Sequence, residues 1–184
     1  MRLEFGGAAI RVAALSVVAV MASAVLITPP SAVASPGDVT GTVLRVVDGD
    51  TIDIRDDVRG RLRIRVLGID TPETKKPGYT VGCWGPQATK FAEENLLGQR
   101  VNFITDPTQN MTDRYGRTLA YLENADGWNY SVEAARAGTA RSYVYDGKPV
   151  SLFSQISAAE QEARAAQRGL WGPPCLGDTE STPA

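Results

Sequence analysis

The sequence of 184 residues contains no histidine. This absence excludes Ser-His-Asp and Cys-His catalysis, zinc sites that use histidine, and a histidine general base. Internal repeats and signs of a second domain are also missing. The length and the globular composition, with 43% hydrophobic and 22% charged residues, therefore indicate one domain of ordinary size.

An excess of positive charge is missing as well, since the formal net charge is −2 at pH 7. Removal of the N-terminal 34 residues would take away two arginines and one glutamate and leave −3. An acidic chain of this kind is not a non-specific coat protein for nucleic acid. If it binds a polyanion, we expect a local cationic site together with a metal ion.

Long apolar runs are absent except near the N-terminus. Residues 1–34 have the pattern of a secretory signal peptide, because Arg2 and Arg11 flank an apolar run over 12–28 and Ala32-Val33-Ala34 fits a cleavage site. We expect cleavage after Ala34 and a secreted protein. The alternative is an uncleaved segment that anchors the protein in a membrane, for which the run is slightly short.

Cysteine occurs only twice, at Cys83 and Cys175. Two thiols without a histidine make a poor metal site. An even pair in an exported protein favours a disulfide, which would tie the C-terminal end to the loop before the first helix. Two separate buried thiols are the alternative.

Carboxylates follow two β-rich runs. Asp48-Gly49-Asp50-Thr51 ends the first, and Asp-Gly is a strong signal for a tight turn. The second run contains Arg65 and ends in Ile69-Asp70-Thr71-Pro72-Glu73-Thr74, where the proline must stop the sheet. An arginine inside such a strand needs an anionic partner. The chemistry of both strand ends suits a hard metal ion and a phosphate.

The coarse pattern predicts five strands and three helices. We expect strands over 39–47, 52–55, 61–70, 99–105 and 118–122. We expect a first helix that begins at Pro86 and is stopped by Gly98, a second that Asn129 caps and that runs through Ala137, and a third over 151–168. Residues 141–145 read as an extended segment, and residues 176–184 as a disordered tail. Arg61 and Arg63 alternate with apolar residues and are expected on a solvated face of the sheet.

Together with Asp113-Arg114-Tyr115-Gly116-Arg117, these motifs resemble the staphylococcal nuclease family, in the order that the family has them. The resemblance runs from about Val39 to Trp171. It implies an α+β, mainly β architecture: an OB-fold, which is a five-stranded barrel, with three helices, over residues 35–175. The five strands, with a helix between the third and fourth, fit the same barrel.

The resemblance also implies site residues. Asp50, Asp70 and the Thr71 carbonyl are expected to ligate Ca²⁺, which accepts irregular sets of oxygen ligands. Glu73 is expected to activate or orient the attacking water. Arg65 and Arg117 are expected to bind the phosphate as forks. Without the other motifs, Arg117 would be read as a charged turn residue that pairs with Asp113.

Tyrosines and a further arginine complete the predicted site. Tyr115, Tyr143 and Tyr145 are expected to line a nucleotide pocket, although tyrosines in extended segments often only pack. Arg114 stands where the family commonly has a lysine and keeps the charge. The lysines Lys75 and Lys76 either meet the nucleic-acid backbone or are simply solvated.

Two classes of function compete. The first is a secreted, calcium-dependent endonuclease that acts on DNA and RNA, with single strands preferred, as a monomer without a stable protein partner. The second is a non-catalytic OB-type module that binds nucleic acid or protein. Loss of any predicted metal or catalytic side chain would mark the second class. All of these residues are present, which favours the enzyme.

Overall fold

The computed structural model describes residues 39–184, and the predicted signal peptide lies outside them. Five strands form a closed barrel, as the resemblance implied, and their order around it is β1-β2-β3-β6-β5. All neighbouring strands are antiparallel except β3 and β6, which run parallel. The barrel strands are β1 Val39–Asp48, β2 Thr51–Asp56, β3 Gly60–Val66, β5 Arg100–Ile104 and β6 Thr118–Glu123.

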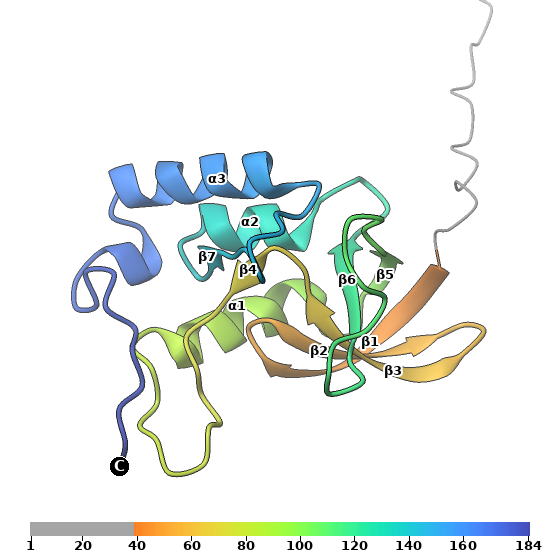
Figure 1. Ribbon diagram of the computed structural model, residues 1–184, viewed down its shortest axis with the longest axis horizontal. Coiled ribbons are helices and arrows are strands. Elements are labelled where there is room, and N and C mark those ends of the chain that lie inside the picture. The colour runs from red at the N-terminus through yellow and green to blue at the C-terminus, as the bar shows by residue number, and fades with distance from the viewer. Residues whose placement is uncertain (1–38) are drawn as a thin grey trace, which may run out of the picture. The chain divides into compact units, whose positions relative to one another are not determined.

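Three helices and one short turn of 3₁₀-helix gather at one end of the barrel (Figure 1). Helix α2 packs against α3 and β6, and α1 packs against β1. Among residues 39–184, no helix is both long and apolar enough to span a bilayer. The helices are α1 Gly85–Leu96, α2 Tyr130–Arg136, α3 Phe153–Ala165 and η1 Gly169–Trp171.

Sequence patterns explain where the helices begin and end. Pro86 lies in the first turn of α1, and Gly98 follows the helix with φ of +76°, a conformation that glycine adopts readily. The Asn129 side chain caps α2 by accepting a hydrogen bond from the Val132 amide. Helix α3 is shorter than predicted, because the chain before Phe153 and after Ala165 forms turns.

The third predicted strand is in fact two strands. Strand β3 ends at Val66, the chain turns at Leu67-Gly68, and β4 Ile69–Asp70 pairs with β7 Arg141–Ser142 in a separate small sheet. Gly68 has φ of +77°, which breaks the extended run. A Cβ there would lie 2.5 Å from Ile156 Cδ1, so α3 closes against the bare backbone of this corner.

Arg61 and Arg63 lie on the solvent-exposed face of the sheet, as predicted, and both also pair with a buried carboxylate. Arg61 Nη2 lies 2.6 Å from Asp53 Oδ2, and Arg63 Nε lies 2.7 Å from Asp53 Oδ1. Asp53 is only 1% exposed, and its hydrogen bonds to Arg63 and then Arg61 lower the pKa of its carboxyl despite burial. A carboxylate beneath the surface therefore orders both guanidinium groups.

The C-terminal segment also differs from its prediction as a disordered tail. Cys83 and Cys175 form the expected disulfide, with 5.8 Å between the Cα atoms. Beyond it, the Thr80 amide donates to the Thr182 carbonyl, and the Ala184 amide donates to the Gly78 carbonyl. Residues after 175 thus run beside the loop that precedes α1, and this loop provides their backbone hydrogen-bond partners. Amino-acid composition does not reveal such backbone pairing.

Candidate active site

The turn between β1 and β2 presents Asp50 at the end of the barrel. The buried hydroxyl of Tyr130 in α2 donates to the Gly49 carbonyl at 2.6 Å and supports the turn from below. A Cβ at Gly49 would lie 2.8 Å from Thr71 Cγ2, so the glycine lets the two strand ends approach each other. The Thr71 amide then donates to Asp50 Oδ2 at 3.0 Å and fixes that carboxylate.

Arg65 joins the two predicted metal-binding carboxylates. Its Nη2 lies 2.9 Å from Asp70 Oδ1 and 3.3 Å from Asp50 Oδ2. Its Nη1 donates to the Val66 and Ile69 carbonyls, which anchors the guanidinium at the corner between β3 and β4. The anionic partner expected for an arginine in this strand is therefore present, and one cationic atom contacts both carboxylates.

Glu73 follows the Thr71-Pro72 bend and stands exposed at the rim of the same site. Its Oε1 accepts hydrogen bonds from the Thr74 and Lys75 amides at 2.8 and 2.7 Å. The Gly82 amide donates to the Glu73 carbonyl at 2.7 Å, which fastens the loop before α1 to this residue. These contacts orient the carboxylate, which forms no ion pair with any side chain in residues 39–184.

Arg117 reaches the site from the loop before β6. Asp113 Oδ1 accepts from the amides of Tyr115 and Arg117, and Asp113 Oδ2 accepts from Arg117 Nε at 2.6 Å. The pairing with Asp113 that sequence left as an alternative is thus real. It also aims the guanidinium, because Arg117 Nη1 lies 3.5 Å from the hydroxyl of Thr51 beside Asp50.

These side chains line a polar cavity of about 230 Å³ that is rich in carboxylates. Burial and then the charge of Asp50 raise the pKa of Asp48 to about 6, and the same two causes raise the pKa of Asp70. Four carboxylates and two arginines line the cavity, so its formal charge is negative. The cavity is lined by Asp48, Asp50, Thr51, Arg65, Asp70, Thr71, Pro72, Glu73 and Arg117.

This excess of negative charge fits a cation. Across residues 39–184, no three histidine, cysteine, aspartate or glutamate side chains form a metal-binding cluster. Asp50 and Asp70 would therefore supply the two carboxylates, and the Thr71 carbonyl a further oxygen. Hard cations accept carbonyl and water oxygens beside carboxylates, so the donor set suits calcium or magnesium and offers no soft ligand.

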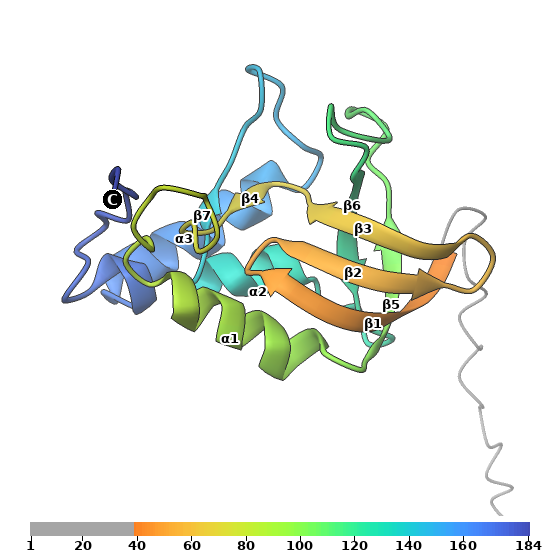
Figure 2. The ribbon, with the colours of Figure 1, turned by 90° about the horizontal axis from the view of Figure 1, so that it is seen from below.

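A larger groove of about 430 Å³ adjoins the cavity, and Arg65 and Arg117 line both. The loop between β5 and β6 and the loop between β7 and α3 project on the same side of the molecule and carry the groove's outer walls (Figure 2). Its walls include the four predicted nucleotide-binding side chains, Arg114, Tyr115, Tyr143 and Tyr145.

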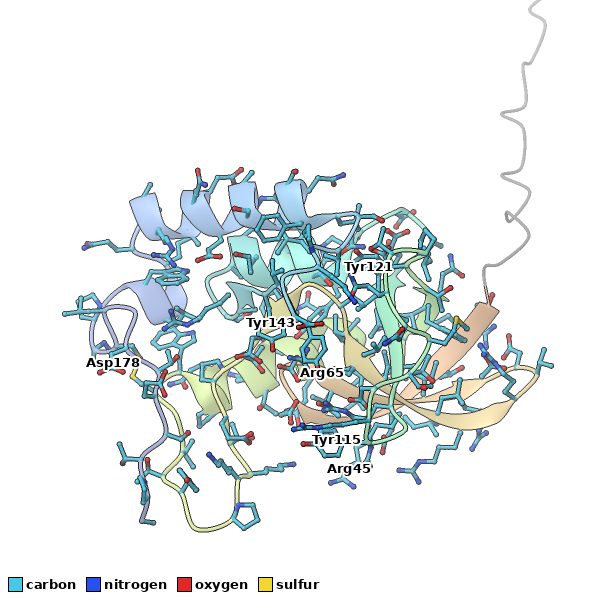
Figure 3. All side chains as sticks on the ribbon, viewed as in Figure 1. Arg45, Arg65, Tyr115, Tyr121, Tyr143 and Asp178 are labelled. Carbon is cyan, nitrogen blue, oxygen red and sulfur yellow. A yellow bond between two sulfur atoms is a disulfide. The ribbon has the colours of Figure 1, made fainter. Side chains whose placement is uncertain are left out.

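The tyrosines face the arginines. The Tyr115 hydroxyl accepts from Arg114 Nη2 at 2.6 Å, and Arg117 Cζ lies 5.4 Å from the centroid of the Tyr115 ring. Arg65 Cζ lies 6.0 Å from the Tyr143 ring, and Figure 3 shows these two side chains together at the centre of the molecule. Tyr115 and Tyr145 are mostly exposed, so a ligand can reach both side chains.

The structure brings every predicted metal, catalytic and nucleotide-binding residue to one of these two adjoining cavities. Sequence reasoning missed Asp48, which lines the acidic cavity and accepts a hydrogen bond from the Asp50 amide. Its signal was its place in the Asp48-Gly49-Asp50-Thr51 turn, two residues before a predicted ligand. The disulfide lies outside both cavities.

Comparison with known proteins adds independent observations. The family described as "Staphylococcal nuclease homologue" matches residues 63–173. The chain is 39% identical to a "Thermonuclease" of Staphylococcus intermedius over 129 residues, which cover 70% of this chain and 74% of that protein. It is 35% identical to a "Thermonuclease" of Staphylococcus hyicus, over 72% and 75% of the two chains.

A third relative is named "Uncharacterized endonuclease" and comes from Escherichia coli O157:H7. It is 38% identical over 135 residues, which cover 73% of this chain and 78% of the relative. The family model covers more than half of the chain, and each of these three relatives is at least 35% identical over 70% or more of it. The chain belongs to the staphylococcal nuclease family.

Proposed function

We propose that this protein is an endonuclease that hydrolyses phosphodiester bonds of DNA and RNA, depends on Ca²⁺ and prefers single strands. The observation that carries the proposal is the position of Arg65 and Arg117, which line both the acidic cavity and the tyrosine-lined groove. A phosphate held by both arginines would lie between carboxylates on one side and a nucleoside pocket on the other. The names of the relatives, two thermonucleases and an endonuclease, support the same activity.

The side chains divide the reaction between them. Arg65 and Arg117 bind the phosphate oxygens as forks and stabilise the negative charge that grows on them as the bond breaks. Glu73, held by the Thr74 and Lys75 amides, orients the water that attacks phosphorus and accepts its proton. Rings of the groove stack on bases without demanding a particular sequence.

Asp50 and Asp70 hold the metal ion in this proposal. Ca²⁺ bound there supplies charge neutralisation for the phosphate and acidity for the attacking water. Calcium rather than magnesium is proposed because Asp50 is fixed by Thr71 while Asp70 is half-exposed, an uneven set of ligands that calcium accepts more readily than magnesium.

The first test is an assay of the purified protein on single-stranded DNA, duplex DNA and RNA. We expect cleavage within the chain of each substrate in Ca²⁺, fastest on single strands, little cleavage in Mg²⁺, and none in excess chelator. Full activity in chelator would contradict the metal requirement. Binding of the same substrates without cleavage under any of these conditions would favour the non-catalytic module.

Export is also part of the proposal. A disulfide between Cys83 and Cys175 supports a protein that folds in an oxidising compartment. We propose that the signal peptide is cleaved after Ala34 and that the mature protein is a monomer. N-terminal sequencing of the protein recovered from culture medium should then begin at Ser35. Recovery of the uncleaved chain in the membrane fraction would support the anchored alternative instead.

A further inference from the structure

Arginines continue beyond the active site along the outward face of the barrel. Residues alternate between faces along a strand, so Arg61 and Arg63 share the face of Arg65, while Leu62 and Ile64 point inward. The register places Arg55 opposite Arg61 and Asp53 opposite Arg63. An irregularity in β1 between Val43 and Arg45 turns Arg45 to this face, opposite Asp53.

These four residues, Arg45, Arg55, Arg61 and Arg63, form what we call the arginine strip. The strip carries four positive charges, and among residues 39–184 Asp53 is the only acidic residue whose side chain forms an ion pair with any of them. Beyond the strip, the pairs of Arg59 with Asp56 and of Arg100 with Asp57 are each neutral. A concentration of positive charge in a chain whose net charge is −2 calls for an anionic ligand.

The charged groups of the arginine strip are exposed to solvent. Asp53 holds Arg61 and Arg63 from below, yet their side chains remain 61% and 49% exposed. Within the part of the chain that the structure describes, no acidic side chain forms an ion pair with Arg45 or Arg55, and both are exposed. Figure 3 shows Arg45 extending from the barrel on the side where Tyr115 and Arg65 lie.

We propose that the arginine strip binds the phosphates of a single-stranded nucleic acid whose scissile phosphate lies at Arg65 and Arg117. This inference rests on the proposed nuclease function and adds a second binding surface to it. Strand β3 carries the path from Arg65 to Arg61 over about 13 Å, at about 3.3 Å per residue. That length holds about four stacked nucleotides at about 3.4 Å each, so long substrates gain contacts that a dinucleotide lacks.

The occupant follows from continuity and charge. The arginine strip begins at Arg63, two residues from Arg65 on the same face of β3, and β3 contains no acidic residue. Phosphate contacts of this kind raise affinity without selecting a base sequence, and they weaken with salt because bound counterions are released. The strip thus predicts a dependence on substrate length and on salt that the two cavities alone do not.

The test uses the double variant Arg45→Ala/Arg55→Ala, because neither side chain holds an ion pair whose loss would strand a buried carboxylate. For a 12-nucleotide single strand we expect KM to rise roughly tenfold at low salt with kcat unchanged. The slope of log KM against log salt should fall by about 1.4, at about 0.7 for each lost contact. For a dinucleotide substrate, both kinetic parameters should stay within about twofold.

Two further variants sharpen the comparison. Arg45→Lys/Arg55→Lys keeps both charges and should restore the KM for the long strand, because counterion release depends on the charge. Arg136→Ala/Arg168→Ala removes two charges from the helical end and should leave all values unchanged. A rise of KM that is equal for long and short substrates, or no rise at all, would overturn the proposal.

Binding measured separately distinguishes this inference from the nuclease proposal. Fluorescence anisotropy of the labelled 12-mer in chelator reports affinity without turnover. If the strip variant binds the 12-mer more weakly but the wild-type protein never cleaves it, the strip stands and the nuclease function fails. If the variant keeps its affinity for the 12-mer and loses only binding to anionic lipid vesicles, the strip is a membrane surface and the proposal is wrong.

Discussion

Asp106 is a buried carboxylate, and no lysine or arginine among residues 39–184 forms an ion pair with it. It is 4% exposed and accepts hydrogen bonds from the Tyr121 hydroxyl at 2.7 Å and from the amides and hydroxyls of Thr108 and Ser151. Burial alone would raise the pKa of Asp106, but these donors outweigh it and lower the pKa well below the usual 3.8. One side chain thereby joins β6 to the loops that precede β6 and α3.

The first prediction concerns replacement of this residue. In Asp106→Asn the amide nitrogen cannot accept hydrogen bonds, so several donors lose their partner. We expect the free energy of unfolding to fall by about 2–4 kcal/mol. Urea unfolding at neutral pH measures the change, with Asp126→Asn in an exposed turn as the control. A loss below about 0.5 kcal/mol would show that the cluster contributes little.

The second prediction concerns acid. A carboxyl whose pKa is lower in the folded state contributes its full stability above its unfolded pKa, and the contribution is lost as pH falls toward the folded pKa. Asp106 and Glu160 both follow this pattern. We therefore expect the free energy of unfolding to decline as pH drops below about 4, and to decline less steeply in Asp106→Asn. Identical pH profiles for the two proteins would contradict the assignment.

Residue chemistry was partly predictable from sequence. The motifs singled out Asp50, Asp70 and Arg65 because a charged residue at a strand end must be solvated or paired. The partner of Arg61 and Arg63 was not predictable, since Asp53 looks like any polar residue in an exposed hairpin. Only the register of β2 against β3 shows that its carboxylate lies beneath both guanidinium groups.

At the scale of elements, the corner between β3 and β4 sets the site. It separates Arg65 from Asp70 by a turn, so the two side chains face each other across it. Apolar residues alternate from Leu62 to Val66 and recur at Leu67 and Ile69, so the sequence predicted one strand over 61–70. The turn depends on the conformation of Gly68 and on contact with α3, and alternation reports neither of these.

The third prediction tests this corner. In Gly68→Ala the alanine must adopt a φ of +77°, and its Cβ would lie 2.5 Å from Ile156 Cδ1 and 2.9 Å from Val150 Cγ2. We expect a loss of about 2–4 kcal/mol, from the left-handed conformation and the overpacking. Gly98→Ala is a matched control, because Gly98 has a similar φ but no atom within 4 Å. It should lose about 1–2 kcal/mol. Equal losses for both variants would show that contact with α3 does not matter.

At the scale of the whole molecule, barrel closure brings distant segments to one place. The sequence predicted the strands and their turns, and the family resemblance implied that they form a barrel, whose strand order the structure gives. It did not reveal that residues after 175 pair with the loop at 78–80, because backbone hydrogen bonds leave no compositional trace. The disulfide was predictable from the number of cysteines, and the structure gives its path beside the loop before α1.

The fourth prediction concerns that disulfide. The bond closes a loop with a sequence separation of 92, so its removal should cost about 4–5 kcal/mol in the chain-entropy account. We expect reduction to lower the melting temperature. Neither cysteine lines the acidic cavity or the groove, so turnover at low temperature should stay nearly intact. Cys83→Ser/Cys175→Ser is the control without reductant. Complete loss of activity on mild reduction would refute a purely structural role.

The central claim is that the acidic cavity with its two shared arginines is where phosphodiester bonds are cleaved. The most direct test is the turnover number of Arg117→Ala on single-stranded DNA in saturating Ca²⁺, with its melting curve recorded beside that of the wild-type protein. We expect a loss of at least about a hundredfold with the fold retained, as when a donor to a developing oxyanion is removed. Arg65→Ala and Glu73→Ala should behave alike. Near wild-type turnover in a folded Arg117→Ala protein would contradict the account.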